Sequence, residues 1–251
     1  MDVQTLRELL MTDAIGLHRQ VVVDLFDENK PIHYEYFTNI LLPGGKILTP
    51  KIFIDTAERS RLIRHIDLRI ARYCVDTARL KKYKDHPQTK YFCNISPETI
   101  RYEINEGGLW KEFFPDEIRM GSLVFDINLA DIQRGDIPVK RFIEKNIMQG
   151  CGFSIDNANF EKKLEIDFID YFSYIKFDAD RLIQRIRELG SPERFQSFKN
   201  TLSHAGIEII VTRVESQDQL DFLKPFEFKF AQGFFFGRPL VIPKGLSQKI
   251  A

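Results

Sequence analysis

The sequence predicts one α/β domain over residues 1–251, a TIM-like (β/α)8 barrel whose first strand is antiparallel. Short runs of β-branched and aromatic residues recur along the chain, and longer helical stretches separate most of them. Strands that are apolar along their whole length are typical of a parallel sheet buried on both faces. About eight such runs within 251 residues favour a closed barrel over an open doubly wound sheet.

The first two predicted strands, residues 21–25 and 32–42, are joined by a turn-like segment at residues 27–31. This connection is too short for a crossover helix, so we expect the two strands to pair antiparallel. Thr49 then provides a helix N-cap, and Pro50 occupies the first helical position. An apolar stripe follows, formed by Phe53, Ile54, Ala57, Leu62, Ile66 and Ile70.

The later elements alternate regularly. Strands are predicted over residues 91–95, 123–127, 152–155, 174–178, 208–211 and 228–231. Helices are predicted between them over residues 97–114, 136–149, 160–172, 180–205 and 217–223. The C-terminal ends of the parallel strands would therefore open onto one face, where barrels of this type build their sites.

The composition excludes several classes of protein. Lys+Arg and Asp+Glu both number 36, and this balance argues against a protein that wraps a nucleic-acid polymer. The chain has no run of about 18 apolar residues that would cross a membrane, and its first residues lack the pattern of a secretory signal. Cys74, Cys93 and Cys151 form no C-x-x-C pair, so we expect reduced, buried thiols in a cytoplasmic protein.

Polar residues stand within or at the end of nearly every predicted strand. They are Glu35, Asn94, Asp126, Asp156, Lys176, Asp178, Thr212 and Gln232. Any one of them has a simple alternative role as a hydrogen-bonded group that precedes a loop. As a set they would converge on one mouth of the barrel, and carboxylate and amide oxygens suit Mg²⁺, Mn²⁺ or Ca²⁺.

These residues and their neighbours resemble the motifs of EAL-type cyclic di-GMP phosphodiesterase domains over nearly the whole chain. Residues 20–25 resemble the family's opening Q-P-I-V-D-L, residues 35–37 fall where E-A-L would stand, and residues 50–58 match P-x-x-F-I-x-x-A-E. Residues 93–96 resemble V-N-L-S, residues 126–129 resemble E-I-T-E, and residues 155–159 sit at L-D-D-F-G. Residues 175–178 resemble L-K-I-D, residues 211–219 A-E-G-V-E-x-x-x-Q, and residues 232–239 Q-G-Y-x-F-x-x-P.

The resemblance implies an enzyme that hydrolyses cyclic di-GMP to linear pGpG with two metal ions. It implies catalytic roles for Glu35 and Lys176. The implied metal ligands are Glu35, Asn94, Asp126 and Asp156. The implied ligand contacts are Gln20, Asp178, Glu215 and Gln232, the last of them to a guanine.

Several positions depart from the family pattern. Asn39 stands where an Arg would contact the ligand's phosphate, and Asn157 replaces an Asp that would serve the second metal. Thr212 replaces a Glu of the metal cluster, and Leu129 replaces the last Glu of E-I-T-E. Two divalent cations about 3.5–4 Å apart need several anionic ligands. We therefore expect the remaining carboxylates to hold at most one Mg²⁺ or Mn²⁺.

The sequence thus favours a catalytically impaired regulatory domain that acts by binding in bacterial second-messenger signalling. Two forms stay open: a receptor for cyclic di-GMP, or an adapter whose surface engages a regulatory protein partner. The alternative is an active, metal-dependent phosphodiesterase that releases pGpG. The resemblance also leaves a homodimer open.

Overall fold

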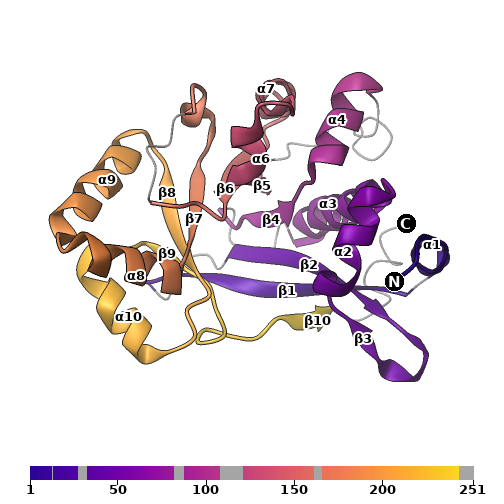
Figure 1. The fold of residues 1–251 in the computed structure, drawn as a ribbon, viewed down its shortest axis with the longest axis horizontal. Helices are drawn as coiled ribbons and strands as arrows, with labels where there is room; N and C mark the ends of the chain where they lie inside the picture. Colours follow the sequence, from indigo (N-terminus) through magenta and orange to yellow (C-terminus); the bar gives the residue numbers. More distant parts are fainter. Residues whose placement is uncertain (13, 28–32, 82–87, 108–120, 161–165, 243–251) are drawn as a thin grey trace.

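The computed structural model describes all residues except 13, 28–32, 82–87, 108–120, 161–165 and 243–251. Within the described residues, eight strands close into a barrel, as the sequence predicts (Figure 1). They are β1 (Ile15–Asp24), β2 (His33–Leu41), β4 (Tyr91–Asn94), β5 (Leu123–Asn128), β6 (Gly152–Asp156), β7 (Tyr174–Asp178), β8 (Glu208–Thr212) and β9 (Phe230–Ala231). The first strand, β1, pairs antiparallel with both β2 and β9, and the other neighbours pair in parallel.

Helices surround the strands of the barrel. They are α2 (Pro50–Arg59), α3 (Ile63–Lys81), α4 (Pro97–Asn105), α6 (Leu129–Arg134), α7 (Val139–Ile147), α8 (Ala179–Leu189), α9 (Pro192–His204) and α10 (Gln217–Leu223). Elements that the sequence analysis did not predict are the N-terminal helix α1 (Val3–Met11), the short helix α6, and two short strands, β3 (Ile47–Leu48) and β10 (Leu240–Ile242). These strands extend β2 and β1 outside the barrel as an antiparallel sheet.

Several predicted boundaries were wrong for local reasons. The helix expected over 180–205 is two helices. Gly190 ends α8 in the left-handed region, with φ 58°, and Pro192 is the first residue of α9. The helical segment that begins at Pro50 and carries the apolar stripe is likewise divided into α2 and α3, with Arg61 at φ 60° between them. The first strand begins at residue 15 rather than 21, since its early half pairs with β2 and β10.

Two other predicted helices were too long. The helix expected over 97–114 ends at Asn105, and residues 108–114 lie outside the described residues. Of the helix expected over 160–172, the described residues form only a 3-10 turn, η2 (Ile169–Tyr171). Residues 161–165 of that segment also lie outside the description. Two further 3-10 turns are η1 (Pro43–Gly45) and η3 (Lys224–Phe226).

The strands are apolar along their length because each buries both faces. One cluster fills the barrel interior: Val22, Phe92, Val124, Ile210 and Phe230. A larger cluster packs the outer faces of the strands against the helices. There Phe142 of α7 meets Phe125 of β5 and Phe153 of β6 edge-on, at ring-centroid distances of 5.7 and 6.2 Å. The three cysteines are free and buried in these layers, as expected.

No helix of the described residues is long and apolar enough to cross a membrane.

A close backbone approach at Gly233 fixes the loop that follows β9. A β-carbon added there would lie 2.6 Å from the carbonyl carbon of Val214. The Val214 amide in turn donates to the carbonyl of Gln232, at 3.0 Å, and so joins the loops after β8 and β9. Gly233 is therefore required by backbone packing beside a predicted site residue.

We predict that Gly233→Ala lowers the free energy of unfolding by more than about 2 kcal/mol, because the added methyl group must displace backbone atoms. Urea unfolding followed by circular dichroism measures this. Gly121→Ala is the matched control, since the nearest atom to its added β-carbon lies 3.9 Å away. Equal stability of the two variants would contradict the prediction.

Candidate functional site

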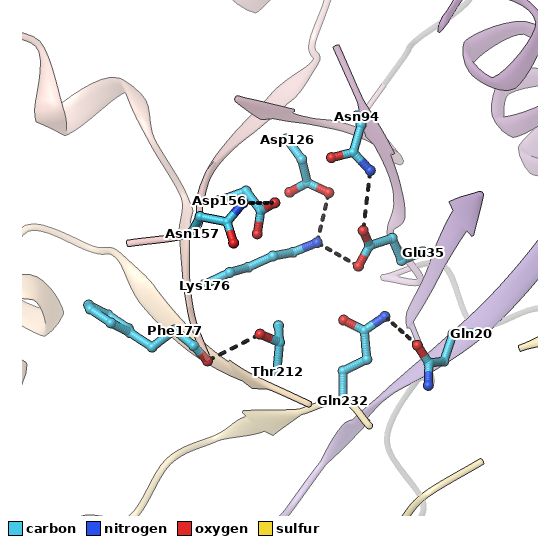
Figure 2. Close-up of polar contacts among 10 residues, drawn as sticks. All are labelled: Gln20, Glu35, Asn94, Asp126, Asp156, Asn157, Lys176, Phe177, Thr212 and Gln232. Atoms are coloured by element: carbon cyan, nitrogen blue, oxygen red, sulfur yellow. Dashed lines mark hydrogen bonds and ion pairs between the residues drawn. The ribbon is translucent and has the colours of Figure 1, made fainter. Parts of the chain in front are cut away.

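The strand registers bring the predicted polar residues to one end of the barrel. Across the β4–β5 pair Asn94 lies beside Asp126, and across the β7–β8 pair Asp178 lies beside Thr212. The antiparallel β1–β2 pair places Gln20 beside Glu35. Because parallel strands end at the same edge, these residues gather at one end of the barrel as expected, and Figure 2 shows all of them except Asp178.

Lys176 of β7 forms the centre of the site. Its ammonium group lies 2.8 Å from Oε2 of Glu35 and 2.7 Å from Oδ2 of Asp126, so one cation serves two carboxylates (Figure 2). The side chain is 1% exposed, and its Nζ also lies 4.8 Å from the centre of the Phe92 ring. Burial by itself lowers the pKa of Lys176, but the surrounding carboxylates raise it by more, so the group stays charged.

Burial also disfavours the ionised forms of the neighbouring carboxylates. Burial raises the pKa of Asp126 to about 7, with Glu35 and Asp156 adding to the rise and Lys176 opposing it. Burial also raises the pKa of Asp156, and the nearby Lys176 opposes that rise. One oxygen of Asp126, Oδ1, is buried with no hydrogen-bond partner. Lys176 therefore provides the positive charge that opposes the effect of burial on both acids.

Neutral groups surround the triad formed by Glu35, Lys176 and Asp126. The Asn94 amide donates to Oε1 of Glu35, at 3.4 Å, and the Asn157 amide donates to Oδ2 of Asp156, at 3.2 Å (Figure 2). The hydroxyl of Thr212 donates to the carbonyl of Phe177, at 3.2 Å. Both Asn157 and Thr212 thus make local hydrogen bonds where the family pattern has acidic side chains.

The two predicted glutamines lie opposite the acids. The Gln232 amide donates to Oε1 of Gln20, at 3.4 Å, and the Gln20 amide donates to the carbonyl of Gly237, at 2.9 Å (Figure 2). Both side chains are buried. The two glutamines thus place an amide pair on the wall of the site.

A pocket of about 400 Å³ opens above these groups. The predicted site residues that line it are Gln20, Glu35, Asn94, Asp156, Glu215 and Gln232. Lys176 and Asp126 contact Glu35 but do not line the pocket themselves. Asp178 also lies outside the lining: its Oδ1 caps α8 through the Arg181 amide, at 3.1 Å.

The match to A-E-G-V-E-x-x-x-Q has a local structural explanation. Gln219 accepts the amide protons of Glu215 and Ser216, at 2.6 and 3.1 Å, and Ser216 caps the Gln219 amide. This capping box starts α10 and places Glu215 at the pocket rim.

The sequence analysis missed one buried carboxylate that supports the site. Asp67 of α3 accepts from the backbone amide and hydroxyl of Ser96, at 2.8 and 2.6 Å, and from the hydroxyl of Thr99, at 2.6 Å. It therefore holds the start of α4, two residues after Asn94. Burial raises the pKa of Asp67 to about 6 despite these hydrogen bonds. The sequence feature that could have predicted this role is a charged residue directly after Ile66, within the apolar stripe.

The analysis also gave no definite role to two aromatic residues. Phe37 of β2 and Phe234, after β9, both line the pocket, and Phe234 is 49% exposed. The aromatic run at residues 234–236 reads the same in sequence whether its rings pack in the core or face a pocket.

The comparison with known families agrees with this geometry. A family model described as the EAL domain matches residues 3–239. The chain belongs to the EAL domain family. Among curated proteins, it is 22% identical over 254 residues to the cyclic di-GMP phosphodiesterase NbdA of Pseudomonas aeruginosa, and the match covers 94% of this chain. The chain spans only 30% of that relative's length.

Solved EAL structures share the fold. The PaMucR phosphodiesterase in complex with c-di-GMP has a TM-score of 0.76 at 20% identity, covering 95% of this chain and 96% of that one. The FimX EAL domain of Pseudomonas aeruginosa bound to c-di-GMP has a TM-score of 0.75 at 22% identity, with the same coverage of 95% and 96%. The Xanthomonas citri FimX EAL domain with c-di-GMP has a TM-score of 0.74 at 18% identity, covering 95% and 92%.

We predict that Lys176→Met lowers the free energy of unfolding of this EAL domain by about 3–5 kcal/mol, because it leaves two buried carboxylates without their cation. Urea unfolding at pH 7 measures the change. Lys140→Met on the exposed face of α7 is the control and should shift stability by less than about 0.5 kcal/mol. The role given to Lys176 fails if both variants unfold alike.

Proposed function

We propose that this EAL domain is a receptor that binds cyclic di-GMP without hydrolysing it. The observation that carries the proposal is the shortage of anionic side chains at the family's metal positions, where Asn157 and Thr212 are neutral and bond to neighbouring groups of the protein. The buried ammonium of Lys176 lies between Glu35 and Asp126 and offsets one of their two negative charges. This positive charge opposes the binding of cations beside it.

The donor set does not fit the two divalent cations that the family implies. Asp156 carries a raised pKa and takes the Asn157 amide on one oxygen, while Asn157 and Thr212 add no negative charge. In the part of the chain that the structure describes, no group of three or more His, Cys, Asp or Glu side chains is arranged to hold a metal ion. Two-metal hydrolysis needs such an anionic cluster for its nucleophile and its leaving group.

The pocket nevertheless keeps the groups that suit a nucleotide base. Gln20, Gln232 and Asn94 offer amide donors and acceptors, and Phe37 and Phe234 offer apolar rings beside them. The pocket of about 400 Å³ has the size of a small-ligand site, and its mostly polar lining suits a polar ligand such as a nucleotide. The PaMucR structure and the two FimX structures, which share the fold, are complexes with c-di-GMP.

A protein adapter is the second candidate, and one contact favours it. Asn39, at the position of the family's phosphate-binding Arg, carries no charge, and its amide lies 2.9 Å from Nε2 of His18. Burial lowers the pKa of His18, so this pair is neutral near pH 7. A domain without a phosphate contact at this position is suited to a regulatory protein partner or to a second copy of the chain.

We predict that the chain binds cyclic di-GMP with micromolar affinity in a calorimetric titration and releases no pGpG in the presence of Mg²⁺ or Mn²⁺. Chromatography of the nucleotide after incubation measures turnover, with Glu35→Ala as the control for a contaminating enzyme. Turnover that Glu35→Ala abolishes would show an active phosphodiesterase. If the chain neither hydrolyses nor binds cyclic di-GMP, the protein adapter is the function that the result supports.

We also predict that Asn157→Asp and Thr212→Glu together raise the affinity for Mn²⁺ more than either of them singly, because metal ligands act as a unit. Calorimetry with Mn²⁺ on the full chain measures this. The matched control replaces the second change with Thr212→Gln, which has similar size and no charge. The charge shortage is refuted if the original chain binds Mn²⁺ as tightly as the double variant.

A further inference from the structure

Arg213 has an unusual position at the pocket. Among the described residues that line the pocket, it is the one with a positive charge, whereas Glu35, Asp156 and Glu215 are acidic. Lys176 lies outside the lining and is already held by two carboxylates. A phosphate that enters this pocket therefore finds its favourable electrostatic partner at Arg213.

The guanidinium is exposed and oriented. Its side chain is 69% exposed, and Nη1 lies 3.0 Å from Oδ2 of Asp178. Asp178 is itself fixed as the N-cap of α8, so it holds the guanidinium at one corner. Most of the five N–H donors of an arginine stay free in this arrangement, and their planar fork matches the geometry of a phosphate.

The backbone at Arg213 is unfavourable for an arginine. Its φ is 57°, in the left-handed region where glycine fits best. The Val214 amide, bonded to the Gln232 carbonyl at 3.0 Å, holds the chain in this turn. The family pattern has a glycine here, so the arginine occupies a position where its backbone is strained. Strained residues of this kind concentrate at functional sites.

The phosphate contact of the family pattern is absent on β2. Asn39 of β2 is neutral, and its amide is paired with His18 of β1. Compared with the family pattern, the positively charged side chain stands in the loop after β8 instead of on β2.

We infer that Arg213 binds a phosphodiester group of the cyclic dinucleotide and replaces the phosphate contact that Asn39 does not provide. This inference rests on the proposed receptor function and adds to it the residue that anchors the ligand's charge. A charge-assisted hydrogen bond to phosphate is among the stronger single contacts, so its loss is expected to weaken binding about 10- to 100-fold.

The test compares two substitutions by calorimetry with cyclic di-GMP, together with thermal unfolding of each variant. Arg213→Gly removes the side chain and relieves the backbone, so we expect affinity to fall about 10- to 100-fold while the melting temperature is no lower than that of the original chain. Arg213→Gln keeps the backbone strain and much of the side chain but loses the charge, and we expect a similar loss of affinity. Added KCl should weaken binding by the original chain more than by Arg213→Gln.

Arg61→Gly is a closely matched control. Arg61 also has a positive φ, 60°, and an exposed side chain, 76%, with its Nε 3.6 Å from Oε1 of Glu98. It does not line the pocket, so its substitution should leave the affinity for cyclic di-GMP unchanged.

The outcomes separate this inference from the proposed function. If the original chain binds and both Arg213 variants bind equally well, the inference is wrong and the receptor function stands. If affinity falls for Arg213→Gly but not for Arg213→Gln, the side chain serves the loop rather than the phosphate, which also overturns the inference. If the original chain does not bind cyclic di-GMP, both the receptor function and the inference fail.

Discussion

The ion triad formed by Glu35, Lys176 and Asp126 dominates the electrostatics at the C-terminal end of the barrel. These three charges come from β2, β7 and β5, so a single ammonium joins strands that are far apart in the sequence. Burial makes an isolated charge there expensive, and Lys176 stabilises both acids, which repel each other. The same arrangement limits the chemistry of the site, because a cation that is part of the protein already occupies the space between two acids.

Two loops at this end of the barrel contain non-glycine residues in the left-handed region. Asn157 follows β6 with φ 52°, and Arg213 follows β8 with φ 57°. Both stand directly after a predicted site residue, and both line the pocket. Asparagine tolerates this conformation better than arginine, because its short side chain can hydrogen-bond locally, as Asn157 does to Asp156. The backbone of the pocket therefore keeps its turns although the residue types differ from the family pattern.

The departures from the family pattern lower the negative charge at the metal positions and shift positive charge to another wall. Neutral side chains at Asn157 and Thr212 bond to neighbouring groups of the protein instead of presenting carboxylates to the pocket. Asn39 bonds to His18, while Arg213 is held at the rim by Asp178. The pocket presents amides, aromatic rings and one exposed guanidinium, and these groups are the basis of the binding role proposed above.

The sequence alone determined the barrel, its antiparallel first strand and the set of polar residues at the strand ends, because strand periodicity and short connections are local properties. It did not determine where helices divide, since the left-handed turns at Arg61 and Gly190 depend on one residue each. Nor did it show that Asp67 holds the start of α4, or that Lys176 is shared by two acids, because those contacts join residues from distant parts of the chain. Only the closed barrel brings these groups within hydrogen-bond distance, and burial then decides which of them share a charge.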